Sequence, residues 1–181
     1  MNKKSIILLF FILVFLGCEK GDGFTEFGFE KIYIPQAMVT GGINDNYTVP
    51  SGGGEYTRNF NVSDGKVNVI LGVLRSGSSK SAAYSVDIKS YTPSAEVLTS
   101  LGGIALPTTL YTLPNKVDVS ADKTGETFYL SIDAQALLSE DYDAKILVLT
   151  VEISNPSLYE LADKGTKLNV VIDVDKLKAY L

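Results

Sequence analysis

Apolar and polar residues alternate along most of the chain. A period of two runs through residues 84–88, 128–132 and 168–174, and this period is typical of a strand with one buried face. Residues 67–73 and 147–153 are nearly continuous apolar runs, which indicates central strands covered on both faces. Shorter candidate strands occupy residues 31–34, 56–62 and 116–119. The pattern therefore predicts about seven or eight strands.

Turn signals rich in glycine and proline separate these segments. The clearest are Gly41-Gly42, Asp64-Gly65, Lys123-Thr124-Gly125 and Asn155-Pro156. Helical periodicity is scarce, and only residues 94–101 and 134–138 favour a short helix each. No longer repeat is present, which excludes a solenoid. Short strands with such breaks predict an all-β fold, an immunoglobulin-like β-sandwich over residues 30–181.

The N-terminal residues follow another pattern. Two lysines precede residues 6–16, an unbroken run of 11 apolar residues, which is shorter than the roughly 20 residues that span a bilayer. The run fits a secretory signal and ends in Gly17-Cys18, a small residue before a cysteine, as in bacterial lipoproteins. We expect residues 1–17 to be a cleaved lipoprotein signal peptide and Cys18 to carry lipid. The alternative is an ordinary secretory signal with an incidental cysteine.

Residues 18–29 are rich in glycine, acidic and without periodicity, so they are predicted to tether the domain to its lipid. Glu19 and Asp22 behind the cysteine resemble the export signal that sends Bacteroidetes lipoproteins to the cell surface. An ordinary linker is the alternative. We expect an outer-membrane protein, exposed at the cell surface, whose membrane contact is the lipid on Cys18.

Charge excludes one class of partner. All 21 acidic residues lie behind residue 17, together with 14 of the 16 basic ones, so the mature chain has a net charge of −7. Such a chain repels phosphate backbones, and we expect no nucleic-acid partner. The 164 residues that remain after cleavage fit one domain.

Candidate chemistry is sparse. The chain has no histidine and a single cysteine, which excludes Ser-His-Asp and Cys-His catalytic arrangements and the usual zinc sites. The acidic residues Asp133, Glu140, Asp141 and Asp143 lack the spacing of an EF-hand loop. We expect a solvated loop there rather than a calcium site. No catalytic residue, metal ligand or cofactor is predicted, and we expect the protein not to be an enzyme.

Tyrosines are the remaining candidates for ligand contact. Tryptophan is absent and ten tyrosines are present, and their amphipathic rings suit half-exposed positions beside polar groups. Tyr91 and Tyr111, near loops, are the predicted ligand-binding residues, and Tyr129 and Tyr142 are weaker candidates. Packing at the core or at a sheet edge is the alternative for each. A proline behind Leu113 favours extended backbone there, so Tyr111 and Leu113 should share one face.

Four short segments carry a resemblance to a known family. They are Tyr33-Ile34-Pro35-Gln36-Ala37, Arg75-Ser76-Gly77, Tyr111-Thr112-Leu113-Pro114 and Val117-Asp118-Val119. With their surroundings, about residues 30–175, they resemble domain-of-unknown-function family 1735 of Bacteroidetes lipoproteins. The resemblance implies a sandwich domain of surface lipoproteins that are commonly encoded with polysaccharide-utilisation systems. Some relatives carry a glycan-binding module or a family 18-like endoglycosidase domain behind the sandwich. The sequence ends at Leu181, so we expect no such module here.

Two functional hypotheses follow. The leading one is a non-enzymatic cell-envelope lipoprotein, an accessory binding protein of a glycan-acquisition system that binds glycan or an envelope partner protein. The alternative is a structural or adhesive β-sandwich module that works by protein–protein assembly. Its distinguishing feature would be an unpaired edge strand, for which residues 168–174 are the candidate.

Overall fold

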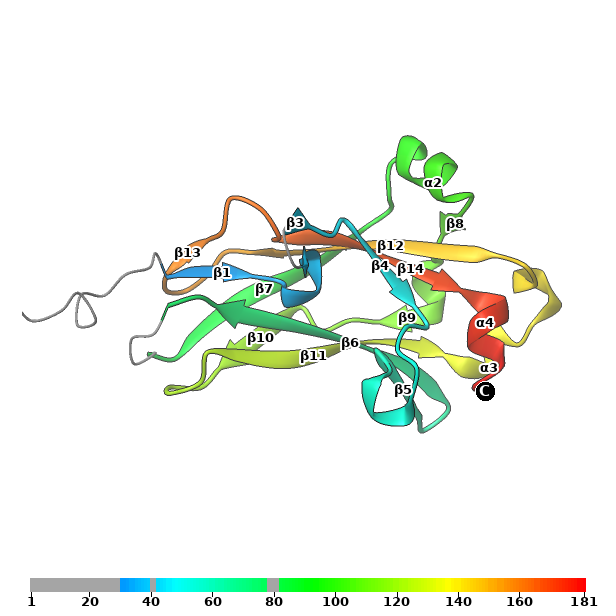
Figure 1. Ribbon diagram of the computed structural model, residues 1–181, viewed down its shortest axis with the longest axis horizontal. Helices are drawn as coiled ribbons and strands as arrows, with labels where there is room; N and C mark the ends of the chain where they lie inside the picture. Colours follow the sequence, from blue (N-terminus) through cyan, green and yellow to red (C-terminus); the bar gives the residue numbers. More distant parts are fainter. Residues whose placement is uncertain (1–29, 40–41, 78–81) are drawn as a thin grey trace, which may run out of the picture.

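Two sheets packed face to face form the protein, as the alternation of apolar residues predicts (Figure 1). The computed structural model describes residues 30–39, 42–77 and 82–181. Within them, eight strands have four or more residues and six are shorter, so the predicted number of principal strands is confirmed. The signal peptide, Cys18 and the tether lie outside the described residues.

Sheet 1 has six strands in the order β13-β1-β6-β11-β9, with β5 also paired to β6. Its strands are β1 (Lys31–Tyr33), β5 (Phe60–Ser63), β6 (Lys66–Arg75), β9 (Tyr111–Thr112), β11 (Gly125–Asp133) and β13 (Glu160–Leu161). The long antiparallel pair β6–β11 forms its centre, with a register that runs from Gly125 opposite Leu74 to Asp133 opposite Lys66.

Sheet 2 also has six strands, in the order β10-β7-β12-β14-β4, with β8 paired to β12. Its strands are β4 (Asn46–Val49), β7 (Tyr84–Tyr91), β8 (Ile104–Ala105), β10 (Lys116–Val119), β12 (Ile146–Ser154) and β14 (Lys167–Asp173). The prediction that residues 168–174 form an unpaired edge strand is wrong. The reason is that β4, from a distant part of the chain, pairs in parallel with β14, so both edges of β14 are hydrogen-bonded.

The remaining elements are short. They are the ribbon β2 (Met38–Val39) and β3 (Gly42–Ile43), the helices α2 (Ala95–Leu101), α3 (Ala134–Leu137) and α4 (Val174–Lys178), and the 3₁₀ turns η2 (Pro35–Ala37), η3 (Glu55–Thr57), η4 (Thr108–Leu110) and η5 (Glu140–Tyr142). Both predicted helices exist. α4 was not predicted, because the alternation of β14 continues in sequence into Val174, which is buried in the helix with Leu177. In the described part of the chain, no helix is long and apolar enough to cross a membrane.

The core lies between the sheets and is built from the inward positions of the long strands. In β12 the apolar run is buried on both faces, since Val148 and Thr150 on the outer side are buried as well. In β6 the outer positions Asn68 and Ile70 are only half-buried. The predicted burial on both faces therefore holds for residues 147–151 of β12, whereas Glu152 is half-buried, as are Asn68 and Ile70 of β6. The helix α2 projects from sheet 2, apart from the two layers (Figure 1).

A buried arginine lies at the end of the sandwich where β1 begins. The Arg75 side chain is fully buried, and its Nη1 donates to Glu30 Oε1 at 2.6 Å. Its guanidinium lies 4.9 Å from the centre of the Tyr159 ring, which meets the Tyr84 ring edge to face. The Tyr84 hydroxyl donates to the Thr124 carbonyl oxygen at 2.9 Å, and burial raises the pKa of Tyr84 to about 12. This cluster joins the first described residue to both sheets.

Candidate functional site

The two tyrosines singled out in the sequence point in different directions. Tyr111 lies on β9 at the edge of sheet 1, where its ring and Leu113 pack against the core. Its hydroxyl is 3.0 Å from the Ser90 Oγ on β7 of sheet 2, so it links the two sheets. Tyr91 follows Ser90 on β7 and therefore points to the opposite face of that strand. The structure does not bring the two rings together, and the placement of Tyr111 agrees with edge packing.

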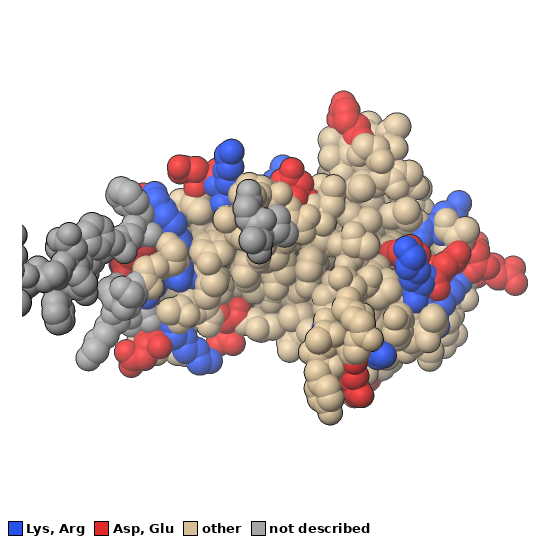
Figure 2. Space-filling view, in the orientation of Figure 1, with Lys and Arg blue, Asp and Glu red and all other residues tan. Residues whose placement is uncertain are grey.

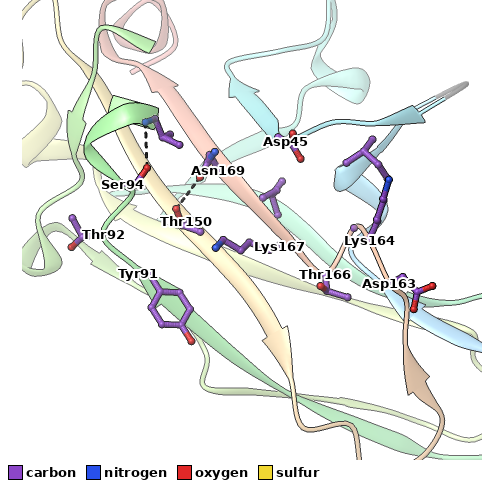
Figure 3. Close-up of a pocket in the computed structure, with 14 residues that line it drawn as sticks. Asp45, Tyr91, Thr92, Ser94, Thr150, Asp163, Lys164, Thr166, Lys167 and Asn169 are labelled. Carbon is purple, nitrogen blue, oxygen red and sulfur yellow. Dashed lines mark hydrogen bonds between the residues drawn. The ribbon is translucent and has the colours of Figure 1, made fainter. Parts of the chain in front are cut away.

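Tyr91 borders a hollow with a volume of about 820 Å³. This groove lies on the outer face of sheet 2, and its residues come from β7, β12, β14, α2 and the segments 43–45 and 163–166. The ring of Tyr91 is 44% exposed. Figure 3 shows the ring at one side of the groove, with Lys164 and Asp163 at the opposite side.

One residue from each of four neighbouring strands forms a row across the outer face. The strand register places Tyr91 opposite Thr150, Thr150 opposite Asn169, and Asn169 opposite Asn46. The first three line the groove, and Asn46 continues the row beyond it on the edge strand β4. We call these four residues the cross-strand row.

Hydrogen bonds join the polar members of the cross-strand row in one direction. Thr150 Oγ1 donates to Asn169 Oδ1 at 2.8 Å (Figure 3), and Asn169 Nδ2 donates to Asn46 Oδ1 at 3.0 Å. Thr150 is only 4% exposed, so its hydroxyl acts mainly by orienting the amide of Asn169. The amide group of Asn46 lies at the exposed end, where its own N–H donors face solvent.

Charged side chains of both signs border the groove. They are Asp45, Asp163, Lys164 and Lys167, and all four are exposed. Among the described residues, none of them has an ion-pair partner within 4.0 Å. The groove therefore combines one aromatic face, the neutral amide of Asn169 and the hydroxyl of Thr150 at its floor, and balanced charge at its rim.

The weaker tyrosine candidates lie elsewhere. Tyr129 is 43% exposed on β11 of sheet 1 and borders a second hollow of about 730 Å³, beside β10. Tyr142 in η5 packs against the core. Neither ring belongs to the groove on sheet 2.

Three of the four acidic residues at the end of β11 and before β12 have local structural partners. Asp133 Oδ1 accepts from the Ala136 backbone N–H at 2.9 Å and caps α3, and Asp143 pairs with Lys178. Asp141 Oδ2 accepts from the Ser139 hydroxyl. Across the ranges that the structure describes, no three acidic, cysteine or histidine side chains are grouped so that they could hold a metal ion.

Sequence reasoning missed three members of the row. Asn169 looked like an ordinary solvent-facing strand position, and the strand that carries Asn46 was not predicted. Thr150 carried a usable signal, because it is the one polar residue between Leu147 and Val151, and a buried hydroxyl needs a hydrogen-bond partner. Its partner depends on strand register, which the sequence did not show.

Comparisons with known proteins bear on the fold. No protein-family model matches the sequence, and no curated protein matches it. A two-domain protein of unknown function from Bacteroides fragilis has a similar structure, with a TM-score of 0.50 and 11% identity over 96% of this chain and 50% of that one. A protein of unknown function from Bacteroides ovatus gives a TM-score of 0.49 at 17% identity, over 80% of this chain and 46% of that one.

A multidomain protein including DUF1735 from Bacteroides ovatus is also similar, with a TM-score of 0.42 and 16% identity over 70% of this chain and 44% of that one. The chain thus spans about half the length of these Bacteroides proteins or less. At such identities the likeness concerns the fold alone. The structural neighbours of this sandwich include Bacteroides proteins of unknown function and a multidomain protein including DUF1735.

Proposed function

We propose that this protein is a non-enzymatic cell-envelope lipoprotein that binds a glycan in the groove of sheet 2. In this proposal Cys18 carries the lipid, the chain is displayed at the outer membrane, and the domain serves as an accessory binding protein of a glycan-acquisition system. The link to glycan acquisition also draws on the resemblance to family 1735. A rigid sandwich is a suitable support, because side chains on strands are held more precisely than those on loops.

The cross-strand row is the observation that carries the proposal. Sugar rings present C–H faces that stack on aromatic rings and hydroxyls that both donate and accept hydrogen bonds. Tyr91 supplies a half-exposed aromatic face at one end of the row, and Asn169 and Asn46 supply amide donors further along it. The carboxylates nearest the groove, Asp45 and Asp163, are exposed at its rim rather than enclosed, so the arrangement favours binding over hydrolysis.

A polysaccharide screen tests the proposal. Residues 19–181, produced without lipid, would be run through native gels that contain one polysaccharide each. We expect at least one polysaccharide to retard the protein, and Tyr91→Ala to abolish the retardation. Tyr129→Ala is the matched control, since Tyr129 has nearly the same exposure, 43% against 44%, but lies on sheet 1. Absence of retardation by every polysaccharide, or equal loss in both variants, would count against glycan binding in this groove.

The anchor is tested separately in cells. Full-length protein should partition into the outer-membrane fraction, and Cys18→Ser should be missing from that fraction because the lipid is its predicted attachment. Protease added to intact cells should digest the wild-type protein if the domain faces outward. Retention of Cys18→Ser in the outer-membrane fraction would contradict the lipid anchor.

A further inference from the structure

We infer that the groove selects an uncharged oligosaccharide, laid across the strands of sheet 2 along the cross-strand row. This inference rests on the proposed function and adds to it the class and direction of the ligand. It is drawn from the geometry of the row, from the direction of its hydrogen bonds and from the charges around it.

The geometry of the row sets the direction. Tyr91 and Asn46 lie at its two ends, three strand spacings apart. Neighbouring strands are about 4.8 Å apart, so the row spans about 14 Å, roughly the length of three linked sugar rings. Figure 3 shows Ser94 on one side of the row and Thr166 and Lys164 on the other, so these lining residues flank the row. A chain that enters at Tyr91 can therefore continue towards Asn46.

The hydrogen bonds of the row favour hydroxyl groups. Thr150 donates to Asn169, and Asn169 donates to Asn46, so each amide oxygen on the row already accepts one hydrogen bond. Each amide oxygen retains a second lone pair, and the amide nitrogens retain further N–H donors. The floor thus offers neutral donors and acceptors in alternation. A sugar hydroxyl, which donates and accepts, satisfies both, whereas a carboxylate or sulfate only accepts.

Charges around the row disfavour an anionic ligand. Two carboxylates and two ammonium groups border the groove. Lys167 also lies directly opposite Glu152 on the neighbouring strand, which offsets its charge further. The whole chain has a net charge of −5. Figure 2 shows acidic and basic side chains interspersed, without a large basic area, on the face that it displays. Polyanion binding needs an excess of cationic side chains, which focuses a positive potential.

The experiment compares two sets of polysaccharides by the same native-gel assay and by calorimetry with short oligomers. Mannan, galactomannan, pullulan and laminarin form the neutral set, and polygalacturonate, alginate and chondroitin sulfate form the anionic set. We expect retention by a member of the neutral set only. Its affinity should change less than about twofold between roughly 0.05 and 0.5 M NaCl, because no net charge is neutralised on binding.

Variants test the direction of the ligand. Asn46→Ala, at the far end of the row, should weaken binding of a trimer or longer oligomer by about fivefold or more while leaving a disaccharide unchanged. Asn61→Ala is the control, because Asn61 is also exposed and accepts a hydrogen bond from an asparagine amide, but on sheet 1.

Each other outcome overturns a specific claim. Retention by the anionic set only, weakened by salt and by Lys167→Met, would refute the uncharged class and keep the proposed glycan binding. Neutral binding that is indifferent to Asn46→Ala would refute the cross-strand direction. Absence of binding to both sets would overturn the inference together with the proposed function.

Discussion

Tyr111 is predicted to hold the two sheets together, and its substitution separates structural from ligand-binding roles. Its ring packs against the core from the edge of sheet 1. Its hydroxyl bonds to Ser90 Oγ of sheet 2 at 3.0 Å. Tyr111→Phe removes only that hydrogen bond, and Tyr111→Ala removes the ring as well. Tyr91→Ala removes a ring that points away from the core on the same part of β7.

The magnitudes follow from burial. A net contribution of about 1 kcal/mol is usual for one such hydrogen bond, so Tyr111→Phe should lower the free energy of unfolding by about that amount. A covered ring area of about 120 Å² contributes about 3 kcal/mol at roughly 25 cal/mol per Å². Tyr111→Ala, which removes both the hydrogen bond and the ring, should therefore lower the free energy of unfolding by about 4 kcal/mol. Tyr91→Ala should lower it by about 1 kcal/mol or less, because it leaves no cavity between the sheets.

Urea titration followed by circular dichroism measures these losses, and the native-gel assay measures binding in the same variants. Tyr111→Phe should bind glycan as wild type does, whereas Tyr91→Ala should stay folded and lose binding. A double-mutant cycle with Ser90→Ala should give a coupling of about 0.5–1 kcal/mol. The reasoning is refuted if Tyr111→Ala unfolds like wild type while binding is lost, since Tyr111 would then be a ligand contact.

Three further predictions concern stability. Arg75→Met removes a buried ion pair and a ring contact, so the free energy of unfolding should fall by about 2–3 kcal/mol in urea, and an unchanged midpoint would contradict this. At Gly52 φ is +95° and a Cβ would lie 2.0 Å from a backbone carbonyl oxygen, whereas Gly53 has open space. In the same titration, Gly52→Ala should lower the free energy of unfolding by about 1–3 kcal/mol, and Gly53→Ala should lower it little. Equal losses in the two variants would contradict the conformational requirement at Gly52. Burial opposes ionisation of Asp173, but the hydrogen bonds and charge of Lys176 hold its pKa below the usual value. The stabilisation by ionised Asp173 is complete above the unfolded-state pKa of about 3.9 and is lost as the pH falls through the lower folded-state pKa. The thermal midpoint of Asp173→Asn should therefore fall less on acidification than that of the wild type. An equal fall in both proteins would contradict this role of Asp173.

The strand pattern was predictable because burial of one face imposes a period of two on the residues. Residues 84–88, 128–132 and 147–153 lie within β7, β11 and β12, and their inward positions form the core. The helix α2 was predictable from local signals as well, since Ser94 caps its first turn and Gly102 ends it at a φ of +60°. These features depend on interactions within a few residues, which the sequence displays directly.

Residues 56–62 were predictable only in part. The chain forms the 3₁₀ turn η3 at Glu55–Thr57 before β5 begins at Phe60. Asn59 holds the turn in place by accepting from the Ser51 backbone N–H at 2.8 Å and donating to the Thr48 carbonyl oxygen at 2.7 Å. Asparagine in such a bridge replaces ladder hydrogen bonds that a strand would make.

The amino-acid sequence by itself determined the long strands, the sandwich class and the absence of histidine chemistry. Only the tertiary structure decided which strands are neighbours, and with that the site. Asn46 and Asn169 are 123 residues apart and meet because β4 pairs with β14. Tyr91 and Tyr111 looked equivalent in sequence, yet one faces solvent and the other the space between the sheets. Register and sheet order arise from packing between distant segments, and a period of two contains no information about which segment lies beside which.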